Sequence, residues 1–266
     1  MPRAKTAVIA SLLPALCTVL VGTTAWAQAT DISPNSLSSG VYYSQGNYGA
    51  PLDTTIRYLP LSYSHQGDTW GFSVTVPYVQ IEGLGNALVN VGGVTRARLA
   101  NRRVDESGLG DVVTALTYQF PSTGENGPFI DLVMEVKIPT ADEKRGLGTG
   151  ETDYSLQLDF FQPLGNVTAF GTGGYRQRGR TELFAGLQDS PFAELGLNFP
   201  LSEVISGGLI YSYSAPASDA STEIHEILPY LNWNFHARWA LMIYGIKGFT
   251  TDSPDVAAGV QLTVRW

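Results

Sequence analysis

The feature that most limits the fold of this chain is a recurring stretch of about ten residues in which apolar and polar side chains alternate. The clearest stretch covers residues 129–139, where the even positions are apolar and the odd positions include Asp131, Glu135 and Lys137. Alternation with period two belongs to a strand with two different faces, whereas a helical face repeats about every 3.6 residues. The chain therefore predicts strands that are apolar on one face and polar on the other.

Residues 153–160 repeat the pattern, with Asp153, Gln157 and Asp159 on the polar face and only apolar side chains on the other. A soluble β-sandwich shows the same alternation, so the choice between the two architectures depends on how the strands end and connect. No apolar run after residue 27 is long enough to cross a membrane as a helix. A lipid-facing surface around a polar interior satisfies the alternation.

Twelve stretches of this kind follow one another. The expected strands are residues 39–46, 54–64, 70–81, 109–120, 128–139, 152–161, 166–177, 191–199, 204–214, 223–235, 238–248 and 257–266. The connections alternate between short turns and long polar loops, of which residues 82–108 are the longest. We therefore predict an all-β fold, a closed transmembrane antiparallel β-barrel of about twelve strands with short periplasmic turns and long outer loops.

The strands expected to descend to the periplasm share an aromatic last residue. These residues are Tyr63, Phe120, Phe160, Phe199, Phe235 and Trp266. Such a ring is typical of the girdle at a membrane interface. Tyr78, Tyr154, Tyr211, Tyr213 and Tyr244 are expected in the outer girdle. Trp266 also resembles the terminal signal that the outer-membrane assembly machinery recognises, the alternative being a buried tryptophan on an edge strand.

Two features fit the strand pattern poorly. Pro60 and Pro229 fall within expected strands, although a closed barrel has no edge strand that can spare a hydrogen-bond donor. We expect local bulges or shifted strand boundaries there. The glycines of residues 171–174 leave the inward face of their strand unreadable, so the direction of Arg176 stays open.

The N-terminus has the features of a signal peptide. Arg3 and Lys5 precede an apolar stretch over residues 7–21, which is followed by Ala25-Trp26-Ala27. Pro14 interrupts the stretch, and a spanning helix needs roughly 20 apolar residues. We predict a signal peptide over residues 1–27, with cleavage near Ala27, and a single outer-membrane barrel domain over residues 28–266.

Cleavage would remove two of the 16 Lys and Arg residues and none of the 24 Asp and Glu residues, leaving a formal net charge of −10. An acidic chain does not favour nucleic acid as a partner. Cleavage would also remove Cys17, the only cysteine, which excludes a disulfide and a thiol active site.

The sequence does not predict an enzyme, a metal site or a cofactor. His65 and His236 lie in expected periplasmic turns, and His225 lies near an outer strand end. The outer-membrane phospholipases carry a serine two positions after a histidine, and none of these three histidines does. Three scattered histidines without cysteine give no metal-ligand cluster. Two glycine segments look like phosphate loops but lack the following Lys-Ser/Thr, so turn chemistry is the better interpretation.

The same glycine segments carry a family resemblance. Gly108-Leu109-Gly110-Asp111, Lys137-Ile138-Pro139-Thr140 and Gly146-Leu147-Gly148-Thr149-Gly150 together resemble the outer-membrane family named for the MetA pathway of phenol degradation. Where that family commonly has Pro-Thr-Gly, this chain has Pro139-Thr140-Ala141. The resemblance implies an outer-membrane barrel linked to uptake of aromatic or other hydrophobic compounds, and it implies no catalytic residues.

Twelve strands lie between the filled barrels of about eight and the open porins of about 16 to 18, so a narrow lumen is geometrically possible. The candidate lining residues are Asp131, Glu135, Lys137, Asp153, Gln157, Asp159, Glu194, Glu226, Asn232 and Asn234. A polar core of ion pairs that fills the barrel is the alternative interpretation. The acidic surplus in this set would disfavour anions.

The sequence thus predicts an outer-membrane channel or passive uptake protein for small solutes, aromatic or hydrophobic ones among them. The expected partners are outer-membrane lipid, the assembly machinery and small-molecule solutes. A structural or surface-interaction barrel without a pore is the alternative, followed by a lipid-modifying enzyme. The solute and the oligomeric state stay open.

Overall fold

The structure is a computed structural model that describes residues 33–48, 53–84, 89–91, 94–96, 103–122, 124, 127–180, 186–219 and 221–266. The expected signal peptide, residues 1–27, lies outside the described residues, as do residues 28–32. Among the residues described, no helix is long and apolar enough to span a membrane.

The described chain consists almost entirely of strands. They are β1 (Asn35–Gly46), β2 (Thr54–Gln66), β3 (Trp70–Leu84), β4 (Val89–Val91), β5 (Val94–Arg96), β6 (Arg103–Leu109), β7 (Val112–Gln119), β8 (Phe129–Ile138), β9 (Asp153–Leu164), β10 (Val167–Gln177), β11 (Ser190–Pro200), β12 (Ile205–Ser214), β13 (Ile224–His236), β14 (Trp239–Gly248) and β15 (Val256–Arg265). A 3-10 helix, η1 (Glu143–Arg145), lies between β8 and β9.

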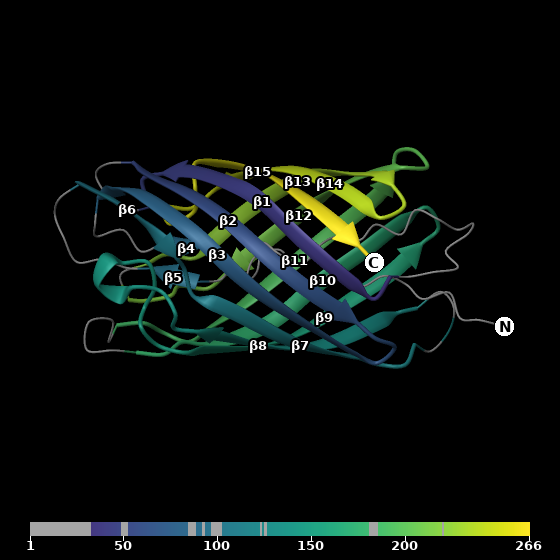
Figure 1. Ribbon diagram of the computed structural model, residues 1–266, viewed down its shortest axis with the longest axis horizontal. Coiled ribbons are helices and arrows are strands. Elements are labelled where there is room, and N and C mark those ends of the chain that lie inside the picture. Colours follow the sequence, from purple (N-terminus) through teal and green to yellow (C-terminus); the bar gives the residue numbers. More distant parts are fainter. Residues whose placement is uncertain are drawn as a thin grey trace.

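The sheet closes on itself. Thirteen strands form one antiparallel sheet in which β1 pairs with both β15 and β2, and β2 pairs with β3. Because β6 and β7 pair with successive halves of β3, they share one position, and the barrel has twelve positions. Figure 1 shows the tilted strands of this barrel. The prediction of a closed antiparallel barrel of about twelve strands is confirmed.

The two ends of the barrel differ. At one end, called here the terminal end, β1 begins and β15 finishes, and the Asn35 amide donates to the Trp266 carbonyl at 3.1 Å. The short turns lie at this end, including those between β2 and β3 and between β13 and β14. The opposite end, called the loop end, carries the longer connections together with β4, β5 and η1 (Figure 1).

The expected loop over residues 82–108 is partly strand, which corrects the sequence interpretation. β3 continues to Leu84 and β6 begins at Arg103, and Glu82 pairs with Asp105 between them. Gly110 and Asp111 then separate β6 from β7. This extension carries charged residues on its outward face, so it lacks the alternation that marks a membrane-facing strand.

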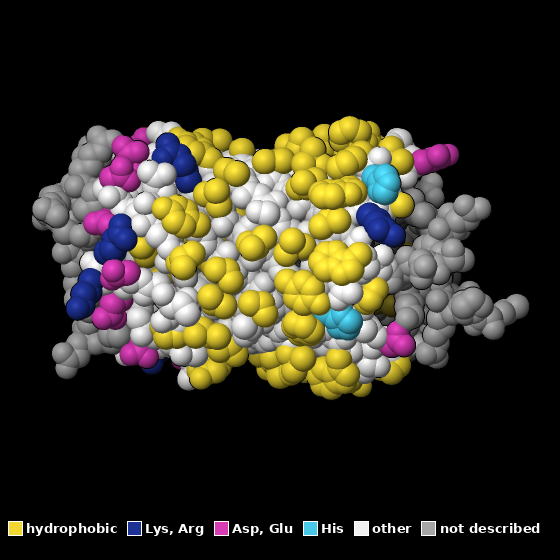
Figure 2. All heavy atoms as spheres, viewed as in Figure 1, with side chains coloured by type: hydrophobic (Ala, Val, Ile, Leu, Met, Phe, Trp, Pro, Cys, Tyr) yellow, Lys and Arg dark blue, Asp and Glu magenta, His cyan; other side chains and the backbone are white. Residues whose placement is uncertain are grey.

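The outward face is apolar over the middle of the barrel. Leu156, Leu158, Leu195, Leu231 and Ile243 are each at least half exposed. Figure 2 shows hydrophobic side chains over the middle of the visible face, with charged side chains gathered toward its two ends. A monomeric soluble protein rarely exposes such a continuous apolar surface, whereas a membrane barrel requires one.

Pro60 lies inside β2 without a bulge, contrary to the sequence expectation. It stands opposite Pro77 of β3. The pairing of β1 with β2 pauses beside Pro60 and resumes in the same register, from the Ser39–Leu61 pair to the Tyr42–Tyr58 pair. The strand keeps its course because the pairs on both sides hold the register.

Pro229 behaves in the same way within β13. It pairs with Leu209 of β12, and the ladder with β14 continues in register at the next pair, Tyr230–Tyr244. The register shift in that ladder lies further along, between Trp233 and His236. The expected bulges or shifted boundaries at the two prolines are therefore wrong.

The interior is not uniformly polar, which corrects a second expectation. One row of ladder neighbours crosses six strands with apolar side chains and one glycine. It consists of Phe129, Phe161, Phe170, Gly196, Ile210 and Leu228. A Cβ on Gly196 would collide with the ring of Phe170, so glycine here makes room for an inward aromatic side chain.

A second inward row carries tyrosines on β13, β14, β1 and β2. Its members are Tyr230, Tyr244, Gly259, Tyr42, Tyr58 and Val79. These side chains join the first row in one buried hydrophobic cluster. Tyr244 was expected in the outer girdle, and this expectation is wrong because its side chain is buried in the barrel. We call the two rows together the apolar rows.

Candidate functional site

A row of acidic side chains runs along the inner wall beside the apolar rows. Each member pairs with the next across neighbouring strands from β8 to β13, in the order Asp131, Asp159, Thr172, Glu194, Ser212 and Glu226. All six side chains are buried. We call this set the acidic row.

The acidic row connects the two ends of the barrel. Asp131 is the third residue of β8, near the terminal end, whereas Glu226 is the third residue of β13, near the loop end. Strands in a barrel tilt by about 35–45° to its axis, so a row perpendicular to the strands winds along the axis as it crosses them. The arrangement supplies a polar track next to an apolar one.

The carboxylates of the acidic row differ in their hydrogen bonds. Asp159 accepts from the Thr172 hydroxyl at 2.7 Å and from the Gln157 amide at 3.0 Å. Its ladder neighbour Asp131 has one buried oxygen, Oδ2, without a hydrogen-bond partner in the described part of the chain. Two adjacent buried carboxylates repel each other unless a cation or a proton lies nearby.

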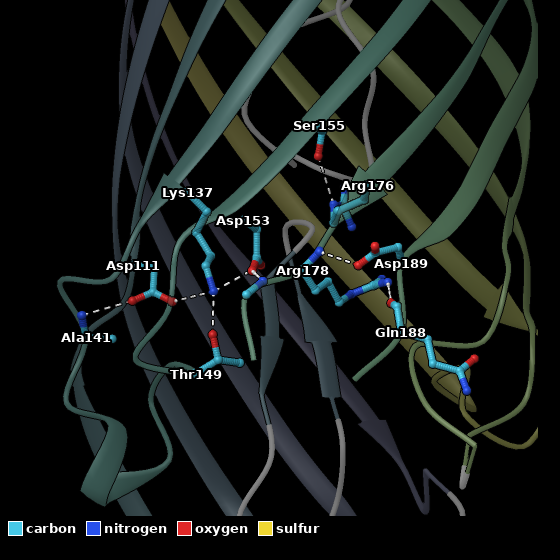
Figure 3. A network of polar contacts seen from close by, with 11 residues as sticks. Asp111, Lys137, Ala141, Thr149, Asp153, Ser155, Arg176, Arg178, Gln188 and Asp189 are labelled. Atoms are coloured by element: carbon cyan, nitrogen blue, oxygen red, sulfur yellow. Dashed lines mark hydrogen bonds and ion pairs between the residues drawn. The ribbon is translucent and has the colours of Figure 1, made fainter. Parts of the chain in front are cut away.

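Charges at the loop end are compensated instead. Lys137 Nζ lies 3.0 Å from Asp153 Oδ2 and 3.3 Å from Asp111 Oδ2, and it donates to Thr149 Oγ1 at 2.6 Å. All four side chains are buried. Figure 3 shows Lys137 between the two carboxylates. We call Asp111, Lys137, Thr149 and Asp153 the loop-end cluster.

The glycine motifs fold the loop between β8 and β9 onto this cluster. Gly146 and Gly150 adopt positive φ angles of 72° and 75°, which glycine adopts without strain. The Ala141 amide donates to Asp111 Oδ1 at 3.0 Å, and Leu147 is buried against Gly108. The motifs that looked like phosphate loops therefore build turns over the mouth of the barrel.

Two arginines that the sequence left unassigned also point inward. Arg176 is buried, donates from Nε to Ser155 Oγ at 3.1 Å and lies 5.1 Å from the centre of the Phe192 ring. Arg178 follows β10 and donates to the Gln188 carbonyl at 2.6 Å (Figure 3). It also donates to Ser190 Oγ at 2.7 Å. Burial lowers the pKa of the Arg178 guanidinium, and these hydrogen bonds offset the cost of burying its charge. The glycines before Arg176 remove the alternation that would have revealed its face.

The other candidate lining residues fall on the same inward positions of their strands. Gln157 and Asn232 are buried, whereas Glu135 and Asn234 are half-buried. Glu135 pairs with Ser155, which in turn pairs with Arg176, so the acid and the arginine lie two strands apart at one level. The structure thus divides the candidates between the loop-end cluster, the acidic row and the positions around them.

The aromatic residues expected in the girdle on the periplasmic side lie where their strands reach the terminal end of the barrel. Phe120, Phe160, Phe199, Phe235 and Trp266 are exposed, and Tyr63 is half-buried. The Tyr63 hydroxyl donates to Asn35 Oδ1 at 2.8 Å, and its ring centre lies 6.4 Å from that of Trp266. Such positions suit side chains at a membrane interface.

Comparison with known proteins agrees with this fold. The model of the family described as "Putative MetA-pathway of phenol degradation" matches residues 38–266. No curated protein sequence matches the chain.

Solved outer-membrane structures share the architecture. The COG4313 outer membrane channel from Pseudomonas putida F1 superposes with a TM-score of 0.68 at 12% identity, covering 91% of this chain and 98% of that one. The NanC porin gives a TM-score of 0.58 at 8% identity, covering 86% and 100% of the two chains. The KdgM porin gives 0.57 at 8% identity, covering 87% and 99%. The barrel fold of this chain indicates an outer-membrane location.

Proposed function

This chain belongs to the family described as "Putative MetA-pathway of phenol degradation", and on that premise we propose that it is a channel or passive uptake protein for small apolar or aromatic solutes. In this proposal the terminal end faces the periplasm, and the solute moves through the barrel interior. The solved COG4313 protein, whose fold this chain shares, is an outer membrane channel, which supports the proposal.

The single observation that carries the proposal is the content of the barrel interior. The apolar rows place phenylalanine, tyrosine, isoleucine and leucine side chains where an open porin has polar walls. Apolar surface inside the barrel favours the transfer of an apolar solute out of water, by about 25 cal/mol per Å² of apolar surface buried. The acidic row beside it supplies a polar wall for water or cations.

A second candidate is a structural barrel without a passage, and one observation favours it. Ile56, Tyr58 and Asp159 are at most 1% exposed, so side chains fill the space around them. A passage therefore requires inward side chains to move. The lipid-modifying enzyme receives less support, because Nδ1 of His65 bonds to Asn35 and Nδ1 of His225 bonds to Tyr211, rather than to a serine hydroxyl.

The experiment measures entry of the apolar fluorophore 1-N-phenylnaphthylamine into intact Gram-negative cells, whose lipopolysaccharide slows such compounds. Cells that express the protein should take up the probe several-fold faster than cells without it, because an apolar interior favours transfer of the apolar probe out of water. A variant with Ile210→Asn and Leu228→Asn should lose much of this gain, whereas the outward Leu195→Ala control should keep it. Equal probe entry in cells with and without well-folded protein would support the structural barrel without a passage. Release of fatty acid from membrane lipid would support the lipid-modifying enzyme.

Export and assembly form a separate part of the proposal. We infer that residues 1–27 direct secretion and that Trp266 contributes to recognition by the assembly machinery. Deleting Trp266 should lower the amount of folded, heat-modifiable protein in the outer membrane far more than Arg265→Gln does. Equal membrane levels of the two variants would contradict the role of Trp266.

A further inference from the structure

Three neutral polar side chains lie in one row of ladder neighbours on the inner wall toward the terminal end. Ser206 pairs with Asn232, Asn232 pairs with Met242, and Met242 pairs with Gln261, so the row of four residues crosses β12 to β15. Their side chains are buried, with exposed fractions of 1% for Ser206 and Asn232, 3% for Met242 and 4% for Gln261. We call Ser206, Asn232 and Gln261 the amide site.

Four polar atoms of the amide site lack partners among the described residues. Ser206 Oγ, both polar atoms of the Asn232 side chain and Gln261 Nε2 make no hydrogen bond to any of them. Buried polar groups in folded proteins are nearly always satisfied, by protein, water or a ligand. Ser206 and Asn232 are direct ladder neighbours and still leave each other unpaired. Their polar atoms are thus available to a third group.

Several other neutral polar groups of the same interior are paired, although Thr54 Oγ1 is also buried without a partner among the described residues. Ser38 and Thr263 share a hydrogen bond of 2.9 Å, and Ser62 and Thr75 share one of 2.8 Å. The buried amide of Asn198 accepts from the Tyr230 hydroxyl at 3.0 Å. The amide site differs from these groups because two of its unpaired side chains, Ser206 and Asn232, are direct ladder neighbours.

The chemistry of the site selects a neutral ligand. The amide groups offer donors and an acceptor, the Ser206 hydroxyl can act as either, and none of the three side chains is ionisable near neutral pH. A hydroxyl group, which both donates and accepts, matches this set. The amide site has no charged side chain, so nothing in it would offset the desolvation free energy of a carboxylate or an ammonium group.

The surroundings of the amide site are apolar. Tyr230 and Tyr244 lie two residues from Asn232 and Met242 on the same inward faces, toward the apolar rows. Met242 lies between Asn232 and Gln261 in the ladder. Methionine is unbranched and adaptable, so its side chain is the one that yields when a ligand enters.

We propose that Ser206, Asn232 and Gln261 bind the hydroxyl group of a neutral solute whose apolar body lies against Tyr230, Tyr244 and a displaced Met242, so that the barrel is selective for alcohols over hydrocarbons and acids. The inference rests on the proposed function, because it requires that small solutes enter the interior. It assigns the solute class and the residues that determine it.

The methionines give a direct readout. Met242 lies in the site, and Met134 faces outward on β8 as an internal control. The full-length protein is labelled with methyl-13C methionine, placed in lipid nanodiscs and titrated with 1-hexanol, hexanoate or 1-methoxypentane. The Met242 methyl signal should shift saturably with 1-hexanol, with an affinity about tenfold higher than for the ether, the factor for one hydrogen bond. Hexanoate should give no saturable shift.

The variants separate a binding site from buried water. Asn232→Leu with Gln261→Met should weaken the 1-hexanol response about tenfold and leave the Met134 signal unchanged. Asn232→Ser is the milder variant if the double change does not fold, and Thr263→Val, outside the site, is the matched control. A Met242 signal that responds equally to all three probes, or that is unaffected by the double change, would overturn the inference.

The two proposals fail in different ways. If the protein promotes entry of 1-N-phenylnaphthylamine into cells but its Met242 signal shows no saturable shift, the amide site is contradicted and the uptake function is kept. Saturable 1-hexanol binding without entry of the fluorophore would keep the site and remove the uptake function.

Discussion

The loop-end cluster and the acidic row solve the same problem of buried charge in opposite ways. In the loop-end cluster, Lys137 is held between Asp111 and Asp153 at 3.3 and 3.0 Å. In the acidic row, Asp131 and Asp159 are ladder neighbours, and one oxygen of Asp131 has no hydrogen bond to the residues that the structure describes. A buried ion pair holds the loop against the barrel, whereas two adjacent buried carboxylates repel each other and cost free energy.

The largest effect is expected from breaking the compensated region. Lys137→Met leaves two buried carboxylates without their cation and should lower the free energy of unfolding by about 3–5 kcal/mol. The measurement is equilibrium unfolding in urea in a lipid or detergent background. Arg145→Met, which removes the exposed pair with Glu106, is the control and should change stability little. Equal effects of the two variants would show that the buried ion pairs of Lys137 stabilise the protein no more than the exposed pair does.

The next largest effect on stability is expected on β8, where one variant places a charge in the lipid and another removes a charge from the interior. Met134 faces outward on β8 and Glu135 faces inward. Met134→Arg should cost about 2–4 kcal/mol near the bilayer midplane. Glu135→Gln should leave folding largely intact in the same unfolding assay. A harmless arginine together with a Gln variant that does not fold would mean that the faces are inverted.

A smaller effect separates aspartates that have a cation from those that do not. Asp153→Asn loses the partner of Lys137 and should destabilise the barrel by about 1–3 kcal/mol. Asp131→Asn removes a charge from a repelling pair and should be neutral or stabilising by up to about 1 kcal/mol. Unfolding midpoints of both variants test this difference. Loss of stability in Asp131→Asn would show that this carboxylate has a compensating partner.

The smallest effect is on ion selectivity. If Asp131, Glu135, Asp153 and Asp159 line a passage, changing all four to Asn or Gln should abolish a weak cation preference, about twofold in permeability ratio, measured as the reversal potential under a salt gradient. Because Asp153 is paired with Lys137, changing only Asp131 and Asp159 should give most of that effect. Conductance with unchanged selectivity would remove these residues from the wall.

The sequence predicted the fold because the relevant signal is local. The faces of residues 153–160 follow from period-two alternation, and the strand count follows from the turns between stretches. It failed where the local signal is absent or shared by both faces. Alternating positions of β14 are apolar on both sides, so the inward position of Tyr244 was not readable. The polar outward face of β6 concealed a strand in the same way.

The amino-acid sequence by itself thus determined that the chain forms an antiparallel barrel with an apolar outer face and several inward acids. Only the tertiary structure decided which inward residues meet. It joined Asp111, Lys137 and Thr149 from three separate motifs, aligned Asp131 with Asp159, and placed Asn232 beside Ser206. The reason is that the faces of one strand depend on its own residues, whereas register across strands depends on the closure of the whole sheet.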